Sequence, residues 1–426
     1  MNRKITLGTL LGILTLGVFL STALAQPPAA PARKQKGRSK ESREQREKSL
    51  RALAQHLEVG QGAVIADIGA GNGPDTWVFA DIVGPDGKVY AEEIDAAKVK
   101  QVRASAEKRN LSQVEAVLGQ PDNPSLPSDV VDMAFMHFVY HHVTQPREML
   151  NAIWKSLKPG GYLVIVDQRL GTLKDWVARE ARGAKHYWIA ETTVVREARE
   201  QGFRFAQCAE SHWHVKKSFV LVFQRPLAMA EPGRDPDPMP PIAQCTLEEL
   251  LPSAAPDSQK VAFIALGAGR KLIAPILKSA ASSGVDIVLD EWATTKQERP
   301  MVPDGVAMTA LMTNQGDLNL EAEQLAAVYF LDSYHLLFHG PKLLAELKQR
   351  LQPAGRVYIL DRRAPQVIPH RLASHRRMIA VETVKREMDQ AGFQFRSEGA
   401  STGPERFLLV FEKAEVAPSA ANDGSR

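Results

Sequence analysis

The sequence is poor in cysteine, with two residues in 426, and only 7% of it is aromatic. Cys208 and Cys245 supply neither a disulfide framework nor a dense zinc cluster, so buried apolar surface must stabilise the fold and no metal site is expected. The two thiols could pair in an oxidising compartment or stay free. A chain of this length exceeds one compact core, so we expect two or three domains.

A strong net charge is also lacking, since the formal charge is +4. Nine Lys or Arg residues against three Glu fall within residues 33–51, and the chain beyond residue 51 is mildly acidic. A nucleic-acid enzyme usually carries its basic patch on the folded domain. The charge distribution therefore argues against a nucleic-acid partner.

The longest apolar run lies at the beginning of the sequence. Two basic residues precede the nearly apolar stretch 5–20, and small residues follow at Ala23 and Ala25. This pattern predicts a secretory signal peptide over residues 1–25 and an exported protein, periplasmic or otherwise extracytoplasmic. If the segment is not cleaved, it would instead anchor the chain in a membrane.

Composition divides the rest of the chain. Residues 26–48 carry a charged run that buries too little apolar surface to offset its ordering entropy, which predicts a disordered basic linker. Six prolines mark a second break, so residues 226–258 are expected to form a Pro-rich linker. A disordered tail is expected at 415–426. Two domains remain, at 49–225 and 259–414.

The two domains share one pattern. Tyr140-His141 and Tyr334-His335 each lie nineteen residues before a Pro-x-Gly turn, which precedes an apolar strand ending in Asp167 or Asp361. A helical pattern, a Gly-Phe-x-Phe segment and an apolar strand then follow in both halves. We infer two copies of one domain. Each copy alternates β-branched runs with helical periodicity, which is typical of an α/β, doubly wound sheet.

The most informative stretch is the strand at 64–68 with its glycine turn, which leads to a helix expected to begin near Pro74. Glycines permit positive φ and let a ligand approach the backbone closely, while a helix N-terminus offers amides to a carboxylate or phosphate. Ligands bind at the carboxyl ends of such strands. A dinucleotide-binding turn would place its third glycine one residue later, which argues against a nicotinamide-dependent oxidoreductase.

The turn resembles motif I of the class I S-adenosylmethionine-dependent methyltransferases. Four later segments are similar to further motifs of that family, in the family's order: 90–95, 118–124, 128–135 and 157–161. The resemblance covers about residues 50–225. It implies two tandem Rossmann-like domains with mostly parallel sheets and an antiparallel final strand, and it implies S-adenosyl-L-methionine as the cofactor.

The resemblance implies a cofactor site of seven residues: Asp67, Gly69, Gly71, Gly73, Glu93, Gln120 and Asp122. Glu93 would take the two ribose hydroxyls, because a carboxylate accepts a bidentate pair. Many relatives carry an acid where this chain has Gln120, so the adenine contact falls to Gln120 or Asp122.

We expect residues for proton transfer in the segments that follow the fourth and fifth strands, because a hydroxyl acceptor would need a general base. His141 and Asp167 are the catalytic candidates, ahead of Tyr140, His142 and His186. Each has a structural alternative: the histidines could fix the loop, and Asp167 could cap the segment that follows it. The sequence leaves the methyl acceptor (small molecule, lipid or protein) and the oligomeric state open.

The second copy departs from the motif. Ala265 replaces the acid, and Lys271 stands where the third glycine should be, which argues against a sulfonium ligand there. Glu291 is a weak match for the second-strand acid, whereas His335 and Asp361 persist. We expect a degenerate, non-catalytic methyltransferase-like domain. The leading hypothesis is thus an exported methyltransferase, and its rival is a binding or scaffolding protein that kept the fold without turnover.

Overall fold

The computed structural model describes residues 40–168, 189, 191–228, 231–238, 260–264, 286–291, 308–312, 322, 325–337, 340–399 and 404–414. The predictions for the signal peptide, the tail, His186, Cys245, Ala265 and Lys271 lie outside these residues. Cys208 is half-buried. None of the helices in the described ranges is both long enough and apolar enough to cross a membrane.

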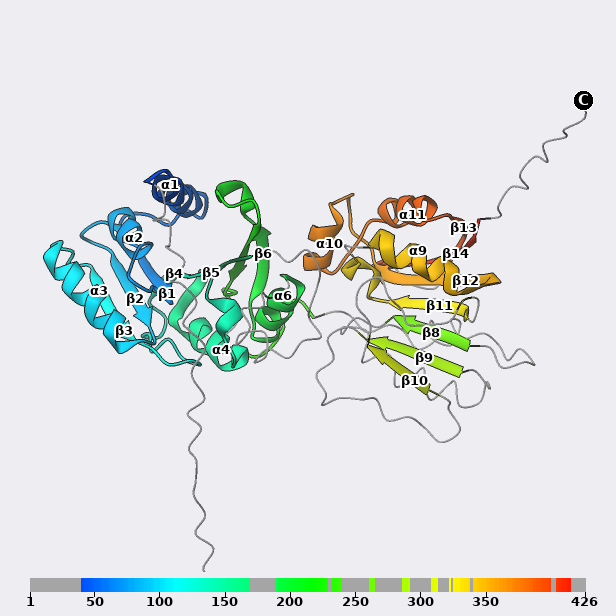
Figure 1. The fold of residues 1–426 in the computed structure, drawn as a ribbon, viewed down its shortest axis with the longest axis horizontal. Coiled ribbons are helices and arrows are strands. Elements are labelled where there is room, and N and C mark those ends of the chain that lie inside the picture. Colours follow the sequence, from blue (N-terminus) through cyan, green and yellow to red (C-terminus); the bar gives the residue numbers. More distant parts are fainter. Residues whose placement is uncertain are drawn as a thin grey trace, which may run out of the picture. The chain divides into compact units, whose positions relative to one another are not determined.

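The first half of the chain contains the following elements (Figure 1): α1 (Lys40–His56), β1 (Val64–Ile68), α2 (Thr76–Val83), β2 (Lys88–Glu93), α3 (Ala96–Lys108), β3 (Val114–Leu118), β4 (Val131–His137), η1 (Tyr140–His142), α4 (Pro146–Ser156), β5 (Leu157–Gln168), α6 (Glu191–Glu200), β6 (Arg204–Cys208), η2 (Glu210–His212) and β7 (Ser218–Gln224). The helix α2 begins at Thr76, two residues after Pro74, with Asp75 as its N-cap residue.

The second half contains β8 (Lys260–Ile264), β9 (Asp286–Glu291), β10 (Met308–Met312), β11 (Leu325–Leu331), η3 (Tyr334–Leu336), α9 (Gly340–Arg350), β12 (Leu351–Arg362), α10 (His370–Arg376), α11 (Val381–Gln390), β13 (Phe393–Glu398) and β14 (Arg406–Lys413).

Within the described residues, each half is built on one seven-stranded sheet, and the two sheets have the same strand order. The first sheet runs β3-β2-β1-β4-β5-β7-β6 and the second β10-β9-β8-β11-β12-β14-β13. Pairing is parallel except at β7 and β14, which run antiparallel to both of their neighbours. The expected α/β fold of two tandem Rossmann-like sheets, mostly parallel with an antiparallel final strand, is confirmed.

Side chains of the first sheet alternate between two apolar layers, as the pleat of a strand requires. On β1, Ile65 packs with α1 and α2, whereas Ala66 and Ile68 pack on the opposite face with α4 and α6. The central strands are buried on both faces, which leaves their carboxyl ends as the place where polar side chains gather.

The helix α1 corrects the prediction of a disordered linker over 26–48, because residues 40–48 are helical. Leu50 and Leu53 of the same helix are buried in the core with Phe79 of α2. Packing of this apolar face supplies the stability that the charged residues alone do not, and the helix extends from it toward the N-terminus. The ion pair of Glu47 with Arg51, one helical turn apart, lies on the exposed side.

Truncation of Leu53 tests this packing. We expect Leu53→Ala to lower the free energy of unfolding by about 2–4 kcal/mol, because the side chain is 1% exposed and leaves a cavity. Denaturant unfolding of the two proteins measures the difference. Gln55→Ala, on the exposed side of α1, is the matched control and should change stability little. Equal effects of the two substitutions would show that α1 does not pack on the sheet.

Candidate functional site

The glycine turn follows β1 and leads into α2. Gly69, Gly71 and Gly73 all have positive φ, at 71°, 60° and 79°. A Cβ on Gly69 would lie 2.5 Å from a methyl carbon of Val139, and one on Gly73 would lie 2.7 Å from the indole of Trp77, so packing demands glycine at both places. A Cβ on Gly71 would meet no atom within 4 Å. The turn is therefore packed at its two ends and open in the middle.

Asp67 lies at the carboxyl end of β1 and is 3% exposed. Its Oδ2 accepts a hydrogen bond of 2.6 Å from the hydroxyl of Thr76, the first residue of α2. Burial, followed by the negative charge of Asp75, raises the pKa of Asp67 to about 7. The carboxyl thus ties the end of β1 to the start of α2, rather than lying at a solvated strand end.

Glu93 ends β2, next to the turn, and is 6% exposed. Its Oε2 accepts from the amide of Gly71 at 3.1 Å, and its Oε1 accepts from the amides of Ile94 and Asp95 at 3.0 and 3.1 Å. Lys98 lies 3.4 Å from Oε2. The structure therefore places Glu93 beside Gly71, as the resemblance implies.

Two exposed apolar residues flank this acid, and the sequence reasoning missed both. Ile94 is 57% exposed, and Leu118, opposite Glu93 on β3, is 53% exposed. Large aliphatic side chains at adjacent strand ends form an apolar surface on which a flat ring can lie. The signal that could have revealed them is their position, because one apolar residue directly follows the predicted acid and the other lies opposite it.

A charged group at the start of α2 was also missed. Asp75 forms an ion pair with Arg46 of α1 at 3.3 Å, and its Oδ2 lies 2.7 Å from Nδ1 of His137, the last residue of β4. The indole of Trp213 meets the ring of His137 edge-on, with 4.9 Å between centroids. These contacts join α1, the glycine turn and β4. Arg46 carried no signal of its own, since it lies within a run of charges.

Gln120 and Asp122 lie on the loop after β3. The backbones of Gln120 and Asn123 pair with each other and close a tight turn. Both predicted residues line a hollow of about 400 Å³ together with Asn151 and Lys155 of α4. The structure thus places them beside α4, and their contact with adenine stays a prediction.

His141 and Asp167 are brought together at the carboxyl ends of β4 and β5. Nδ1 of His141 lies 2.9 Å from both carboxylate oxygens, and the amide of His141 donates to Oδ2 at 3.2 Å. His335 and Asp361 form the same contacts in the second half, at 2.8–3.1 Å for the ring nitrogen and 2.9 Å for the amide. All four residues are buried.

Other candidates take up different positions. The hydroxyl of Tyr140 donates to Glu197 of α6 at 2.8 Å, and that of Tyr334 donates to Glu387 of α11 at 3.0 Å. His142 is exposed, and its ring packs against that of His141. Glu291 ends β9, the strand that corresponds in sheet order to β2.

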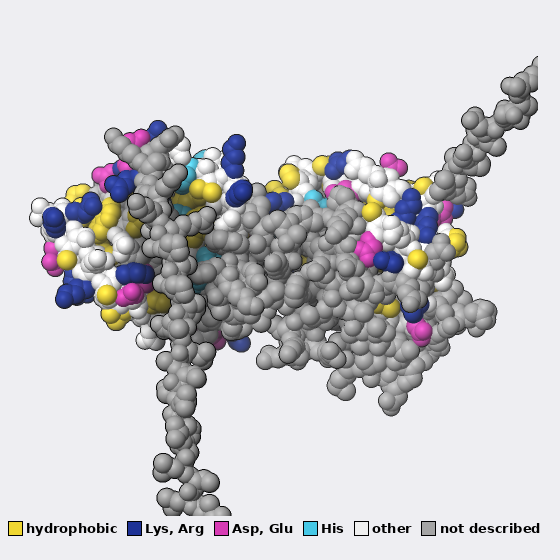
Figure 2. Space-filling model, in the orientation of Figure 1, with side chains coloured by type: hydrophobic (Ala, Val, Ile, Leu, Met, Phe, Trp, Pro, Cys, Tyr) yellow, Lys and Arg dark blue, Asp and Glu magenta, His cyan; other side chains and the backbone are white. Residues whose placement is uncertain are grey.

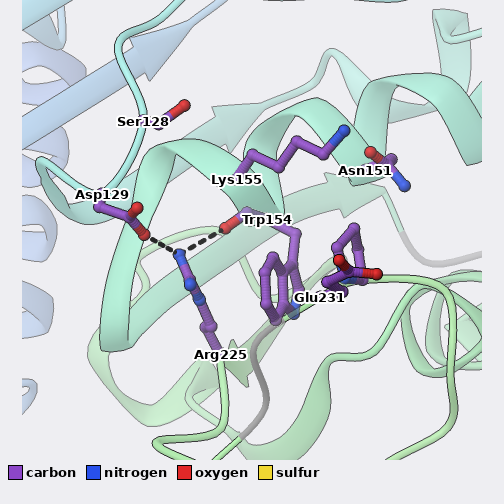
Figure 3. A pocket seen from close by; sticks show the side chains of 8 residues that line it. Ser128, Asp129, Asn151, Trp154, Lys155, Arg225 and Glu231 are labelled. Carbon is purple, nitrogen blue, oxygen red and sulfur yellow. Dashed lines mark hydrogen bonds and ion pairs between the residues drawn. The ribbon is translucent and has the colours of Figure 1, made fainter.

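A second hollow, of about 390 Å³, lies near the amino ends of β4 and β5 (Figure 3). Arg225 lies over the ring of Trp154 and donates to the carboxylate of Asp129 and the carbonyl of Trp154. Because Arg225 is already engaged by Asp129 and the carbonyl of Trp154, and the hollow lies away from the glycine turn, we assign it no ligand. Across the described residues, no group of three His, Cys, Asp or Glu side chains could hold a metal ion.

A seven-stranded sheet of this order, with a glycine turn after β1 and an acid at the end of β2, defines the class I methyltransferase fold. Residues 60–212 match the family model described as a methyltransferase domain. Residues 60–212 therefore form a methyltransferase domain with the class I fold.

Curated relatives match over about a quarter of the chain. An arsenite methyltransferase of Halobacterium salinarum is 26% identical over 106 residues, which are 25% of this chain and 27% of that protein. A ubiquinone/menaquinone biosynthesis C-methyltransferase of Escherichia fergusonii is 29% identical over 112 residues, 26% of this chain and 44% of that protein. The chain thus spans less than half the length of these relatives.

Among solved structures, a SAM-dependent methyltransferase from Aquifex aeolicus is 23% identical, with 41% of this chain and 89% of that chain covered and a TM-score of 0.36. A putative sarcosine dimethylglycine methyltransferase from Galdieria sulphuraria is 12% identical, covers 42% of this chain and 85% of its own, and also has a TM-score of 0.36.

The repeated His-Asp pair yields a prediction about stability. We expect Asp167→Asn and Asp361→Asn each to lower the free energy of unfolding by about 1–3 kcal/mol, because both leave a buried amide and ring nitrogen with a poorer acceptor. Denaturant unfolding of each variant checks the two values. A loss confined to Asp167→Asn would show that the second pair does not perform the same structural task.

Proposed function

We propose that the chain is an exported S-adenosylmethionine-dependent methyltransferase, in which the first domain binds the cofactor and the second is non-catalytic. The observation that carries the proposal is the open middle of the turn at Gly71, directly beside the buried carboxylate of Glu93. An amino-acid carboxylate fits the turn, where the N-terminus of α2 favours negative charge.

The rest of the surroundings fit the same cofactor. Glu93 offers carboxylate oxygens to a vicinal diol, and the exposed side chains of Ile94 and Leu118 offer apolar area to a purine ring. Asp67, through Thr76, holds the helix whose N-terminus faces the turn. Gln120 or Asp122 would provide polar contacts to the base.

Methyl transfer requires little of the protein beyond orienting the cofactor and the acceptor. When bound, S-adenosylmethionine supplies an electrophilic methyl group on a sulfonium centre. The domain would bind both partners in line and exclude water from them. His141 would accept a proton from a hydroxyl acceptor, with Asp167 holding its Nδ1, the arrangement in which imidazole exchanges protons through its other nitrogen.

Export, partners and the inactive second domain rest on the sequence. The N-terminal segment supports export to a periplasmic or extracytoplasmic location, with membrane attachment if it stays uncleaved. Ala265 and Lys271 support loss of cofactor binding in the second domain. Basic and acidic side chains are interspersed over the described surface in Figure 2, which supports a small-molecule, lipid or protein acceptor over a nucleic acid.

Calorimetric titration of the mature chain with S-adenosylmethionine and S-adenosylhomocysteine tests the proposal. We expect micromolar binding of both, and we expect Gly71→Arg to abolish it because the new side chain fills the open turn. Glu93→Gln should weaken binding about tenfold, through loss of a charged acceptor.

Gly62→Arg is the matched control for the glycine substitution. Gly62 also has positive φ, at 78°, and open space around its Cβ position, but it lies before β1, away from the turn. It therefore adds the same side chain and the same backbone strain without touching the site. Absent binding to the unmodified chain would favour a scaffolding protein, and equal losses in both arginine variants would locate the effect outside the turn.

A further inference from the structure

Glu92 is a buried acid of the site that the proposed function does not use. Its side chain is 2% exposed and points to the face of β2 opposite that of Glu93, because side chains alternate along a strand. Its Oε2 accepts a hydrogen bond of 3.0 Å from the amide of Gly69. Its Oε1 has no hydrogen-bond partner in the part of the chain that the structure describes.

Gly119 lies against the other carboxyl oxygen. A Cβ on Gly119 would come within 1.7 Å of Oε1 of Glu92, so this position accepts no larger residue while the carboxyl stays in place. The amide of Gly119 donates to the carbonyl of Glu93 at 3.2 Å. The Glu92 carboxyl therefore spans the segments that follow β1 and β3, the two strands on either side of β2.

The charge state of this carboxyl follows from its surroundings. Burial raises the pKa of Glu92 to about 8, and the charges of Glu93 on its own strand and Asp67 on β1 also raise it, against the hydrogen bond from Gly69. Gly69 and Gly119 bring no charge, and Lys98 of α3 pairs with Glu93. At neutral pH the group is an uncharged acid with one accepting oxygen and one hydroxyl.

We propose that Glu92 is a positioning residue that holds the amide of Gly69 and, through it, the cofactor-binding turn. An apolar residue here would leave that amide without its acceptor. A third negative charge would be repelled by Asp67 and Glu93. The binding part of this inference rests on the proposed function, whereas the effect on the turn can be measured without a cofactor.

Two substitutions separate the functions of the group. Glu92→Gln keeps a carbonyl acceptor and cannot ionise, whereas Glu92→Leu removes the acceptor at similar size. In calorimetric titrations with S-adenosylhomocysteine at pH 7, we expect the Gln variant to bind within about twofold of the unmodified chain and the Leu variant about tenfold more weakly.

The pH dependence has a defined sign. Ionisation of Glu92 places a further negative charge beside Asp67 and Glu93 and so disfavours the arrangement of the turn that binds the ligand. Affinity is then full below about pH 8 and is lost as the pH rises above it. Between pH 7 and 9.5, the Kd of the unmodified chain should therefore rise relative to that of Glu92→Gln, which also corrects for titration of the ligand. Parallel curves would overturn the neutral-acid assignment.

Amide hydrogen exchange tests the contact with the turn in the cofactor-free protein. Glu92→Leu should speed exchange at Gly69 about fivefold or more, and Glu92→Gln should not. Glu115→Gln, an acid on β3 whose side chain is 52% exposed, is the matched control.

The outcomes are distinguishable. If the unmodified chain binds no S-adenosylhomocysteine, the proposed function fails. If Gly69 exchanges equally fast in the chain and in Glu92→Leu, this inference fails. If Glu92→Leu does not fold, a second comparison decides. The exchange rate of the Gly69 amide is then measured from pH 7 to 9.5 in the unmodified chain and in Glu92→Gln. Identical pH profiles of the two proteins overturn the inference.

Discussion

Two of the backbone amides that hold the glycine turn to the sheet donate to side chains, and the site depends on them. Gly69 and Gly71 donate to the carboxyl groups of Glu92 and Glu93, two consecutive residues of β2. Because consecutive side chains of a strand point to opposite faces, the turn is held from both faces of the sheet edge. The place where a ligand can meet the backbone is thus set by the register of β1 and β2, not by the loops alone.

The carboxyl ends of β1 and β2 carry three buried acidic side chains, whereas acids at ordinary strand ends are solvated. Asp67, Glu92 and Glu93 lie close together. Burial raises the pKa of the first two, and nearby negative charge adds to it: that of Asp75 at Asp67, and those of Glu93 and Asp67 at Glu92. Neighbouring groups compensate: a hydroxyl donates to Asp67 and three amides donate to Glu93. Such a row favours a ligand that brings hydroxyl, amino or sulfonium groups, and this is consistent with the cofactor proposed.

The sequence predicted the sheets, the turn and the proximity of Glu93 to Gly71, because glycine spacing and strand periodicity are local signals. It did not predict the helix over residues 40–48, whose stability comes from packing of Leu50 and Leu53 on the sheet. Nor did it find the joining of Arg46 to Asp75. That contact links positions far apart along the chain, and the residue types alone do not indicate which partner each one has.

The repeated His-Asp pair bears on whether His141 has a catalytic role. Phe138, three residues before His141, has φ of 56°, and Asp332 has φ of 50° at the corresponding place before His335. A left-handed conformation at a residue other than glycine costs about 1–2 kcal/mol, so each turn must be held by its surroundings. In both halves the aspartate binds the backbone and ring of the histidine that follows the strained residue. The pair therefore stabilises the turn first, and any proton transfer by His141 would be an additional task for a residue already required by the fold.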